Sequence, residues 1–288
     1  MNFLELAKSV LPDFDKIELI AVKDDLQNII GWEANAYLNN GYPISGGLHS
    51  NQQTAIRICV AELIERCLVK FISTSNEANK FRLEAHPGTC GFAAGFECEK
   101  TKQRAIGEGL ERWAWSKWID EGHNISHKTL LKKDLTPISI YIIEQFEKLN
   151  FYSREIKFKD TCYDFNVVVA EVNSGVFAGS RVTITGSMDW EHAFVEAYRN
   201  LKNYQAFNKN RNQFDIYKNI IRSRAIYFAE HKEVAFEQIN RATQKIWPNP
   251  ELLILEEYKN CPSNTFLFRC LMKDYIPWHL GDEKRFVY

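Results

Sequence analysis

The sequence predicts an α+β fold in which strand, loop and helix repeat, with buried acidic helices packed on β-sheets. Two observations support this prediction most strongly. The motif E-x-x-E-R occurs twice inside apolar stretches, at residues 62–66 and 108–112, and a loop of small residues precedes each copy. A third strand, turn and long helix follow from residue 165 onward, with acids on the helix but without the E-x-x-E-R spacing.

The first motif lies on a helix predicted from Ala55 to Ile72. Only five of these residues are charged, and apolar side chains cover most of the remaining circumference. A helix that is apolar nearly all round is a buried helix. Residues three and four positions apart share one face of a helix, so Glu62, Glu65 and Arg66 form a single polar stripe in that buried surface.

The second motif lies on a helix predicted from Arg104 to Ile119, which carries three tryptophans and places Glu108, Glu111 and Arg112 on one stripe. Ionised carboxylates are costly to remove from water unless a cation or donor meets them. Two such helices packed together favour divalent ions, as in metal-binding helix bundles. The sequence therefore predicts that both helices face one cation-filled space, with four metal ligands: Glu62, Glu65, Glu108 and Glu111.

A simpler interpretation is that each motif is an ordinary helix in which glutamate supports arginine three and four positions on. For a single copy this interpretation is the better one. The repetition, the burial and the preceding small-residue loops favour the metal site instead.

Both small-residue loops are predicted to open onto an acidic helix. The first is Ser45 to Ser50, with Ser50 or Asn51 as the helix cap, and the second is Gly88 to Gly95. Glycines allow the backbone to approach a ligand closely, and N–H groups at a helix start suit phosphate. A plain turn between strand and helix remains the alternative, because neither loop matches a known phosphate-binding glycine motif.

The other elements follow from apolar periodicity and turn residues. No change in composition marks a linker, so we expect a single domain over residues 1–288. The expected elements are a helix at 3–10, strands at 17–22 and 29–37, a helix at 138–149, strands at 165–172 and 181–185, a turn at 186–189, a long helix from about Trp190 and a strand at 266–272.

Composition narrows the function classes. With 45% hydrophobic residues, 25% charged residues and a net charge of −1, the chain is an ordinary globular protein and not an electrostatic binder of nucleic acid or membranes. It lacks a signal-peptide pattern and a spanning apolar run, so we expect a cytoplasmic protein. The seven cysteines include no C-x-x-C pair, which argues against zinc clusters and disulfides.

Two further patterns remain open. Residues 199–224 carry seven bases and one acid with interleaved aromatics, which fits an RNA or acidic-peptide surface, but a solvated helix face is the better interpretation because the whole chain is nearly neutral. His123 and His127 are four apart in a predicted loop, which is a weak metal signal. No nucleophile motif of the G-x-S-x-G type is present.

At this point the sequence resembles the YcaO family. That family carries a G-K-G loop before S-A-x-x-E-x-x-E-R, and N-G-x-A-A-G-N before G-x-x-E-x-x-E-R-D. This chain has Gly46-Gly47 before Ala61-Glu62-Leu63-Ile64-Glu65-Arg66, and Gly91-Phe92-Ala93-Ala94-Gly95 before Glu108 to Arg112. Looser matches follow in family order: residues 167–172, 186–196, 226–230 and 268–277.

The resemblance implies an enzyme of ribosomal peptide natural product modification. It would use ATP and Mg²⁺ to activate a backbone amide and form an azoline, thioamide or amidine. In that family the acids of both helices hold magnesium against the ATP phosphates. Carried over by position, the ATP and Mg²⁺ site would consist of Glu62, Glu65, Arg66, Glu108, Glu111, Arg112 and Lys100.

The chain also departs from the family pattern. Leu48 stands where the family has the loop lysine, and Ile58 replaces a serine. Phe96 and Lys100 occupy the asparagine and glutamate positions of the nucleotide site, and Trp113 the aspartate after the second E-R. These departures favour an alternative: a non-catalytic YcaO-like partner or scaffold that binds peptide or another modifying enzyme.

The resemblance also bears on partners. The chain lacks the fused peptide-clamp domain of many relatives and their extended proline-rich C-terminus. We therefore expect a peptide substrate, a separate peptide-recognition or activating protein, and a homodimer, with no membrane and no nucleic acid.

Overall fold

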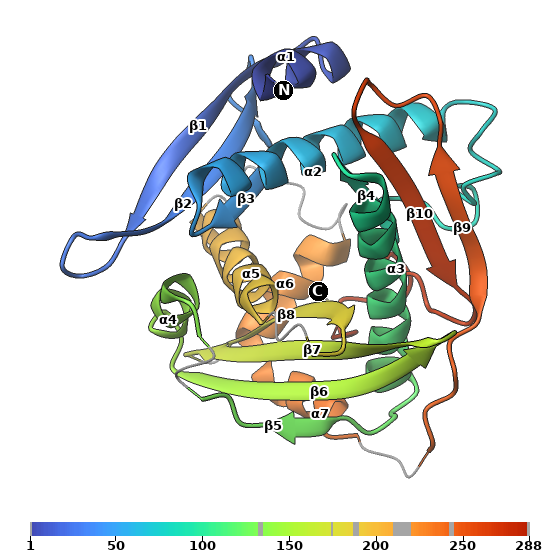
Figure 1. Cartoon of the computed structure of the whole chain (residues 1–288). Coiled ribbons are helices and arrows are strands. Elements are labelled where there is room, and N and C mark those ends of the chain that lie inside the picture. Colours follow the sequence, from blue (N-terminus) through green and yellow to red (C-terminus); the bar gives the residue numbers. More distant parts are fainter. Residues whose placement is uncertain are drawn as a thin grey trace. The chain divides into compact units, whose positions relative to one another are not determined.

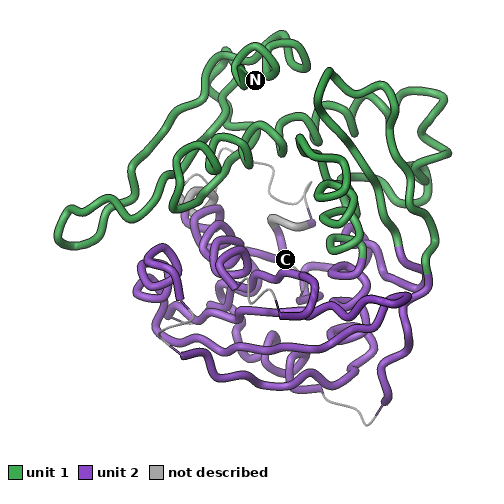
Figure 2. The backbone as a smooth tube through the Cα atoms, viewed as in Figure 1, with its two compact units in different colours: residues 1–109, 252–271 green, residues 110–251, 272–288 purple. Residues whose placement is uncertain are grey.

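The computed structural model describes residues 2–131, 135–173, 175–186, 190–209, 220–241 and 245–286. The chain divides into two compact units (Figure 2). Unit 1 comprises residues 1–109 and 252–271, and unit 2 comprises residues 110–251 and 272–288. Each unit is described by itself below. The single-domain prediction, which concerns the whole chain, stays a prediction.

Unit 1 begins with a three-stranded antiparallel sheet of order β1-β2-β3, followed by a long helix (Figure 1). Small residues on the inner face of the sheet, including Ala34 and Ala36, meet small residues of the helix such as Ala55 and Cys59. This pairing allows the helix to lie close to the sheet. The elements are α1 (Phe3–Val10), β1 (Phe14–Lys23), β2 (Ile29–Leu38), β3 (Pro43–His49) and α2 (Gln52–Ser73).

The predicted glycine loop at Ser45 to Ser50 is wrong, because residues 43–49 form strand β3. A Cβ at Gly47 would lie 2.1 Å from the carbonyl oxygen of Ala55, so the glycine is there to let the strand pack on α2 and not to open a loop. The predicted cap is confirmed in part: the side chain of Asn51 accepts from the N–H of Thr54 at 3.0 Å.

A second antiparallel sheet in unit 1 has the order β4-β10-β9. The predicted loop at Gly88 to Gly95 therefore ends in a strand, and it is not free to fold over a ligand. Gly91 has φ +78°, and a Cβ there would lie 2.1 Å from the carbonyl oxygen of Cys270. The elements are β4 (Phe92–Gly95), α3 (Cys98–Trp115), β9 (Leu252–Tyr258) and β10 (Phe266–Met272).

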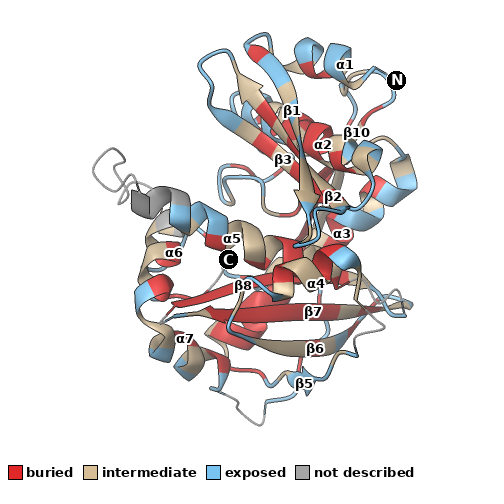
Figure 3. Ribbon diagram, turned by 90° about the vertical axis from the view of Figure 1, so that its left-hand side faces the viewer, coloured by how far each residue is buried: buried red, intermediate tan, exposed pale blue. Residues whose placement is uncertain are grey.

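Unit 2 contains a four-stranded antiparallel sheet of order β5-β6-β7-β8. Strand β7 is buried for most of its length (Figure 3). The last turns of α3 contribute Trp115 and the following π-helical turn contributes Trp118, and both rings contact Phe165 of β7. The elements are η1 (Ser116–Asp120), β5 (Ser126–Lys128), α4 (Pro137–Ile143), β6 (Lys148–Phe158), β7 (Thr161–Val172), β8 (Gly175–Ile184), α5 (Glu191–Lys209), α6 (Ile220–Glu230) and α7 (Lys232–Ile239).

The helix predicted at 138–149 is too long, because α4 ends at Ile143 and β6 begins at Lys148. The N–H of Glu147 donates to the carbonyl of Glu171, so the chain has already joined the sheet at that point. The strands predicted at 165–172 and 181–185 lie within or overlap β7 and β8, and the long helix from Trp190 is α5. The turn predicted at 186–189 lies outside the described residues after Gly186.

The two units share one internal plan. In unit 1 the order is α1-β1-β2-β3-α2, and in unit 2 it is α4-β6-β7-β8-α5, with the first helix packed on the last in each case. The N-cap residues of α1 and α4, Asn2 and Thr136, are 134 positions apart (136 minus 2). Glu62 of α2 and Glu196 of α5 have the same offset (196 minus 62). The chain thus contains two copies of one α-β-β-β-α arrangement.

No helix among the described residues has the length and apolar content needed to cross a bilayer. All seven cysteines are free thiols, and Cys59 and Cys270 are buried.

Candidate functional site

The acids of α2 lie where the helix faces strand β3. Glu62 accepts a hydrogen bond from the backbone N–H of Gly46 at 3.0 Å and pairs with Arg66 at 2.5 Å. Its side chain is 25% exposed, so it can still be reached by a ligand. The local cause is the close approach of β3 to α2 at Gly47, which brings the edge of the strand within reach of the helix side chains.

Glu108, the motif acid of α3 that lies in unit 1, is close to this group. Burial raises the pKa of Glu65 to about 8, and the negative charges of Glu108 and Glu62 add to the rise, while Arg104 and Arg66 oppose it. The structure therefore brings Glu62, Glu65 and Glu108 within electrostatic range of one another, with Arg104 and Arg66 beside them. Their role as metal ligands stays a prediction.

This group of carboxyl side chains fits a hard divalent cation. Carboxylate oxygens are ligands that Mg²⁺ prefers, and Mg²⁺ usually takes one or two carboxylates and completes its shell with water and substrate phosphate. Within the residues that the structure describes, no three histidine, cysteine, aspartate or glutamate side chains are already close enough to hold a metal between them. The donors thus suit magnesium with additional ligands rather than a closed all-protein cage.

The second motif continues along α3 into unit 2, where Glu111 is 1% exposed. Its carboxylate accepts from the hydroxyl of Ser180 at 2.8 Å, and the indole N–H of Trp115 donates to the same hydroxyl at 2.7 Å. Arg112 lies 3.6 Å from the Glu111 carboxylate. Strand β8 therefore holds the Glu111 carboxylate in place through Ser180.

Glu196 on α5 is an acid of this group that was not predicted as a site residue. Burial alone would raise its pKa, but a hydrogen bond from His192, the charges of His192 and Arg112, and the N–H of Ser180 outweigh burial and lower the pKa to about 2. Ser180 N donates to its carboxylate at 3.2 Å. Its likeness to Glu62 is structural: Ser180 precedes Glu196 by 16 residues, as Gly46 precedes Glu62, and in each pair the backbone N–H of the first donates to the carboxylate of the second.

The remaining predicted site residue, Lys100, lies near the start of α3. Its side chain is 76% exposed and pairs with Glu97 at 2.7 Å, and Glu97 also pairs with Arg57 at 3.2 Å. The ring of Phe96 contacts the ring of Phe3 at 5.2 Å. Lys100 and Phe96 therefore have partners in unit 1 other than the four motif acids, and the role of Lys100 in binding ATP stays a prediction.

The weaker sequence signals find no ligand set in the described residues. His123 is buried beside Glu121 and Trp247, and His127 lies on strand β5. Much of the basic stretch at 199–224 falls at 210–219, outside the described residues.

The fold resembles solved YcaO structures. Over 92% of this chain and 86% of the other, the chain matches the YcaO from Methanopyrus kandleri bound with AMPPCP and Mg²⁺, with a TM-score of 0.52 and 12% identity. It matches the E. coli microcin synthetase McbBCD complex with a TM-score of 0.58 and 8% identity, over 89% of this chain and 86% of that one. No protein-family model and no curated protein sequence matches the chain.

A further match is a heterocyclase in complex with substrate and cofactor, with a TM-score of 0.55 and 9% identity. It covers 94% of this chain and 52% of that one, so this chain spans about half the length of the heterocyclase. Together these likenesses show a YcaO-like α+β fold, as the motifs predicted.

Proposed function

We propose that this chain is a YcaO-like enzyme that binds ATP with Mg²⁺ and modifies the backbone of a ribosomally made peptide. The observation that carries the proposal is the group Glu62, Glu65 and Glu108, in which burial, together with the neighbouring acids, raises the pKa of Glu65 to about 8. A divalent cation that enters such a group stabilises the ionised carboxylates, because its charge offsets both their burial and their repulsion. The Methanopyrus kandleri YcaO, bound with AMPPCP and Mg²⁺, supports the choice of ligand.

The residues of the chain have distinct parts in this proposal. The acids of α2 and α3 hold Mg²⁺, and Arg66 and Arg112 meet phosphate oxygens, since guanidinium groups bind phosphate with two parallel donors. Gly46 and Ser180 keep the acids in place by backbone and hydroxyl hydrogen bonds. Bound ATP would supply a phosphoryl group that activates an amide oxygen, a reaction that depends mainly on positioning and charge neutralisation.

The peptide and any partner belong to the same proposal. One matching structure is the McbBCD complex with pro-MccB17 bound, which is a multi-protein complex holding a peptide. We expect this chain to act on a peptide presented by a separate recognition protein, and to form a homodimer, as the sequence resemblance implies. The product, whether azoline, thioamide or amidine, would follow from which nucleophile attacks the amide.

A second candidate is a non-catalytic YcaO-like partner. It is favoured by Phe96 and Lys100, which stand at two nucleotide-site positions of the family and are engaged with Phe3 and Glu97 of this chain. In that case the fold would serve peptide binding or assembly without ATP.

One experiment separates the two. The chain is incubated with a candidate Cys-, Ser- and Thr-containing precursor, ATP and Mg²⁺, and the peptide mass is followed. Loss of one water, or exchange of oxygen for sulfur when a sulfur donor is added, supports the enzyme. Glu65→Gln on α2 should abolish the change. Glu99→Gln removes an exposed carboxylate near the start of α3, outside this acid group, and should retain the change. A peptide that is bound but never altered, in every nucleotide condition, supports the partner.

A further inference from the structure

One aromatic ring covers the arginine of the second motif. The guanidinium carbon of Arg112 lies 3.5 Å from the ring centroid of Trp278, well inside the range of a cation–π contact. Both residues are largely buried, since the Arg112 side chain is 12% exposed and Trp278 is 8% exposed. Arg112 is therefore held between an indole face and the carboxylate of Glu111, which lies 3.6 Å from it.

The ring belongs to a segment that we call the C-terminal strap, residues 276–286. Two buried arginines hold the strap by its backbone. Arg224 donates to three of its carbonyl oxygens, those of Trp278, Leu280 and Asp282. Arg285 donates to three as well, those of Ile276, Pro277 and Leu280. A backbone fixed at so many carbonyls leaves the ring of Trp278 little freedom.

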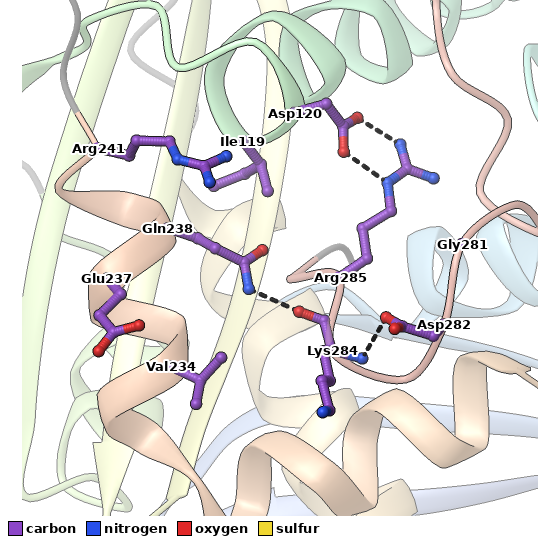
Figure 4. Close-up of a pocket in the computed structure, with 10 residues that line it drawn as sticks. All are labelled: Ile119, Asp120, Val234, Glu237, Gln238, Arg241, Gly281, Asp282, Lys284 and Arg285. Carbon is purple, nitrogen blue, oxygen red and sulfur yellow. Dashed lines mark hydrogen bonds and ion pairs between the residues drawn. The ribbon is translucent and has the colours of Figure 1, made fainter.

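The far end of the strap is anchored beside a pocket of about 560 Å³ (Figure 4). There Arg285 forms a two-pronged ion pair with Asp120, with contacts of 2.8 and 2.6 Å. Gln238 of α7 donates to the carbonyl of Lys284 and accepts from the N–H of Phe286. The Phe286 ring then packs against Trp115, which lies on the same helix as Arg112. The strap is thus tied to α3 at both ends.

We infer that Trp278 is a positioning residue for Arg112: the strap holds the indole against the guanidinium so that the guanidinium keeps one fixed orientation. A long arginine side chain without such a face would lose rotamer freedom on binding an anion. Stacking leaves the edge of a guanidinium available for hydrogen bonds, because the ring contacts only its face. The inference rests on the proposed function, in which Arg112 meets a phosphate.

The test uses the full chain and a non-hydrolysable ATP analogue with Mg²⁺, titrated against four proteins. Trp278→Leu removes the ring, and we expect its analogue dissociation constant to rise about fivefold to tenfold. Trp278→Phe keeps an aromatic face and should recover most of the affinity. Lys284→Ala alters an exposed strap side chain and should bind like the unaltered chain. Melting temperatures are measured in parallel.

A readout independent of nucleotide accompanies the titration. The Nε–H resonance of Arg112, assigned with Arg112→Lys, should be shifted by the indole ring current in the unaltered chain and lose that shift in Trp278→Leu. The inference is overturned if the unaltered chain binds the analogue and Trp278→Leu binds it equally well, or if Trp278→Phe matches Trp278→Leu in affinity at equal melting temperature. Absence of binding by the unaltered chain, with the ring-current shift present, contradicts the proposed function and with it the role of Trp278 in presenting Arg112 to phosphate.

Discussion

The two copies of the α-β-β-β-α arrangement hold their acids in opposite electrostatic conditions. In unit 1 burial, with added repulsion from Glu108 and Glu62, raises the pKa of Glu65 to about 8. In unit 2 the equivalent of Glu62 is Glu196, and its pKa is lowered to about 2 because His192, Arg112 and Ser180 stabilise the carboxylate. The backbone hydrogen bond is the same in both copies: the N–H of Gly46 donates to Glu62, and the N–H of Ser180 donates to Glu196.

This difference between the pKa values of Glu65 and Glu196 gives the two copies different roles in the proposal. A carboxyl group whose ionisation is disfavoured by burial and by neighbouring acids gains from an added cation, whereas an acid already matched by donors and an arginine serves as a fixed anchor. The copy in unit 1 therefore carries the metal-dependent part of the proposal. In unit 2, Arg112 stacks on Trp278, and in the proposal this arginine meets phosphate.

The largest expected effect is on folding, at the glycine that brings strand and helix together in each copy. A Cβ at Gly47 would lie 2.1 Å from the carbonyl oxygen of Ala55, and one at Gly179 would lie 2.2 Å from that of Ala193. We expect Gly47→Ala and Gly179→Ala each to lower the free energy of unfolding by about 3 kcal/mol, the upper part of the range for overpacking. Urea denaturation measures it.

The control is Gly41→Ala. Nothing lies within 4 Å of a Cβ there, but φ is +77°, so the expected loss is only about 1 kcal/mol. Equal losses at positions 41, 47 and 179 would show that close packing of strand on helix is not what the two copies share.

The next prediction compares a serine hydroxyl of unit 2, Ser180, with one of unit 1, Ser45. Ser180→Ala removes a donor to the buried carboxylate of Glu111 and leaves the indole N–H of Trp115 without its acceptor. We expect a loss of about 2 kcal/mol. In unit 1, Ser45→Ala removes a bond to the carbonyl of Cys59 and a contact with its thiol, and it leaves no carboxylate without a donor, so the expected loss is about 1 kcal/mol. Thermal unfolding of both variants compares them, and a larger loss for Ser45→Ala would contradict the anchoring role of Ser180.

A third prediction concerns protons. Since the pKa of Glu65 is about 8, most molecules carry a proton there at pH 7, and a cation must displace it. Mg²⁺ binding at pH 7 should release close to one proton, and affinity should rise with pH up to about 8. Calorimetry in two buffers of different ionisation enthalpy measures the release. Glu65→Gln should remove the proton release, and Glu196→Gln should retain it. The reverse pattern would place the cation near Glu196 and contradict the prediction.

The last prediction concerns how the free energy of unfolding depends on pH. A raised pKa at Glu65 means that stability falls as pH rises from the ordinary value of 4.5 towards 8, because the unfolded chain ionises first. A lowered pKa at Glu196 means that its contribution is present above pH 4.5 and is lost as pH falls towards 2. Melting temperatures from pH 3 to 9 should be flatter at the alkaline end in Glu65→Gln and at the acid end in Glu196→Gln. Parallel curves for both variants would argue against these assignments.

Long periodic elements could be predicted from the sequence. The helix expected at 55–72 is Gln52–Ser73, and the strand expected at 266–272 is Phe266–Met272. Their apolar patterns determine burial directly. The glycines of β3 were misleading, because Gly47 serves close packing with α2, a contact that depends on a residue eight positions away in another element. The apolar pattern of residues 144–149 predicts a helix, because the pairing of Lys148 and Leu149 with β7 cannot be seen in the sequence.

The site was predictable to the extent that it repeats. Glu62, Glu65 and Glu108 were identified from E-x-x-E-R and meet in unit 1. Glu196 has no such motif, and its likeness to Glu62 lies in a backbone hydrogen bond from a residue 16 positions earlier, which depends on the fold. Trp278 is far from Arg112 in sequence and is brought to it by the fold, through contacts that include those of Arg224 and Arg285 with strap carbonyls.

The most direct measurement of the central claim is a calorimetric titration of the chain with a non-hydrolysable ATP analogue and Mg²⁺. The account predicts saturable, Mg²⁺-dependent binding by the unaltered chain and by Glu99→Gln, and its loss when Glu62→Gln and Glu111→Gln are combined. No heat from the unaltered chain, or equal binding by the double variant, would contradict it.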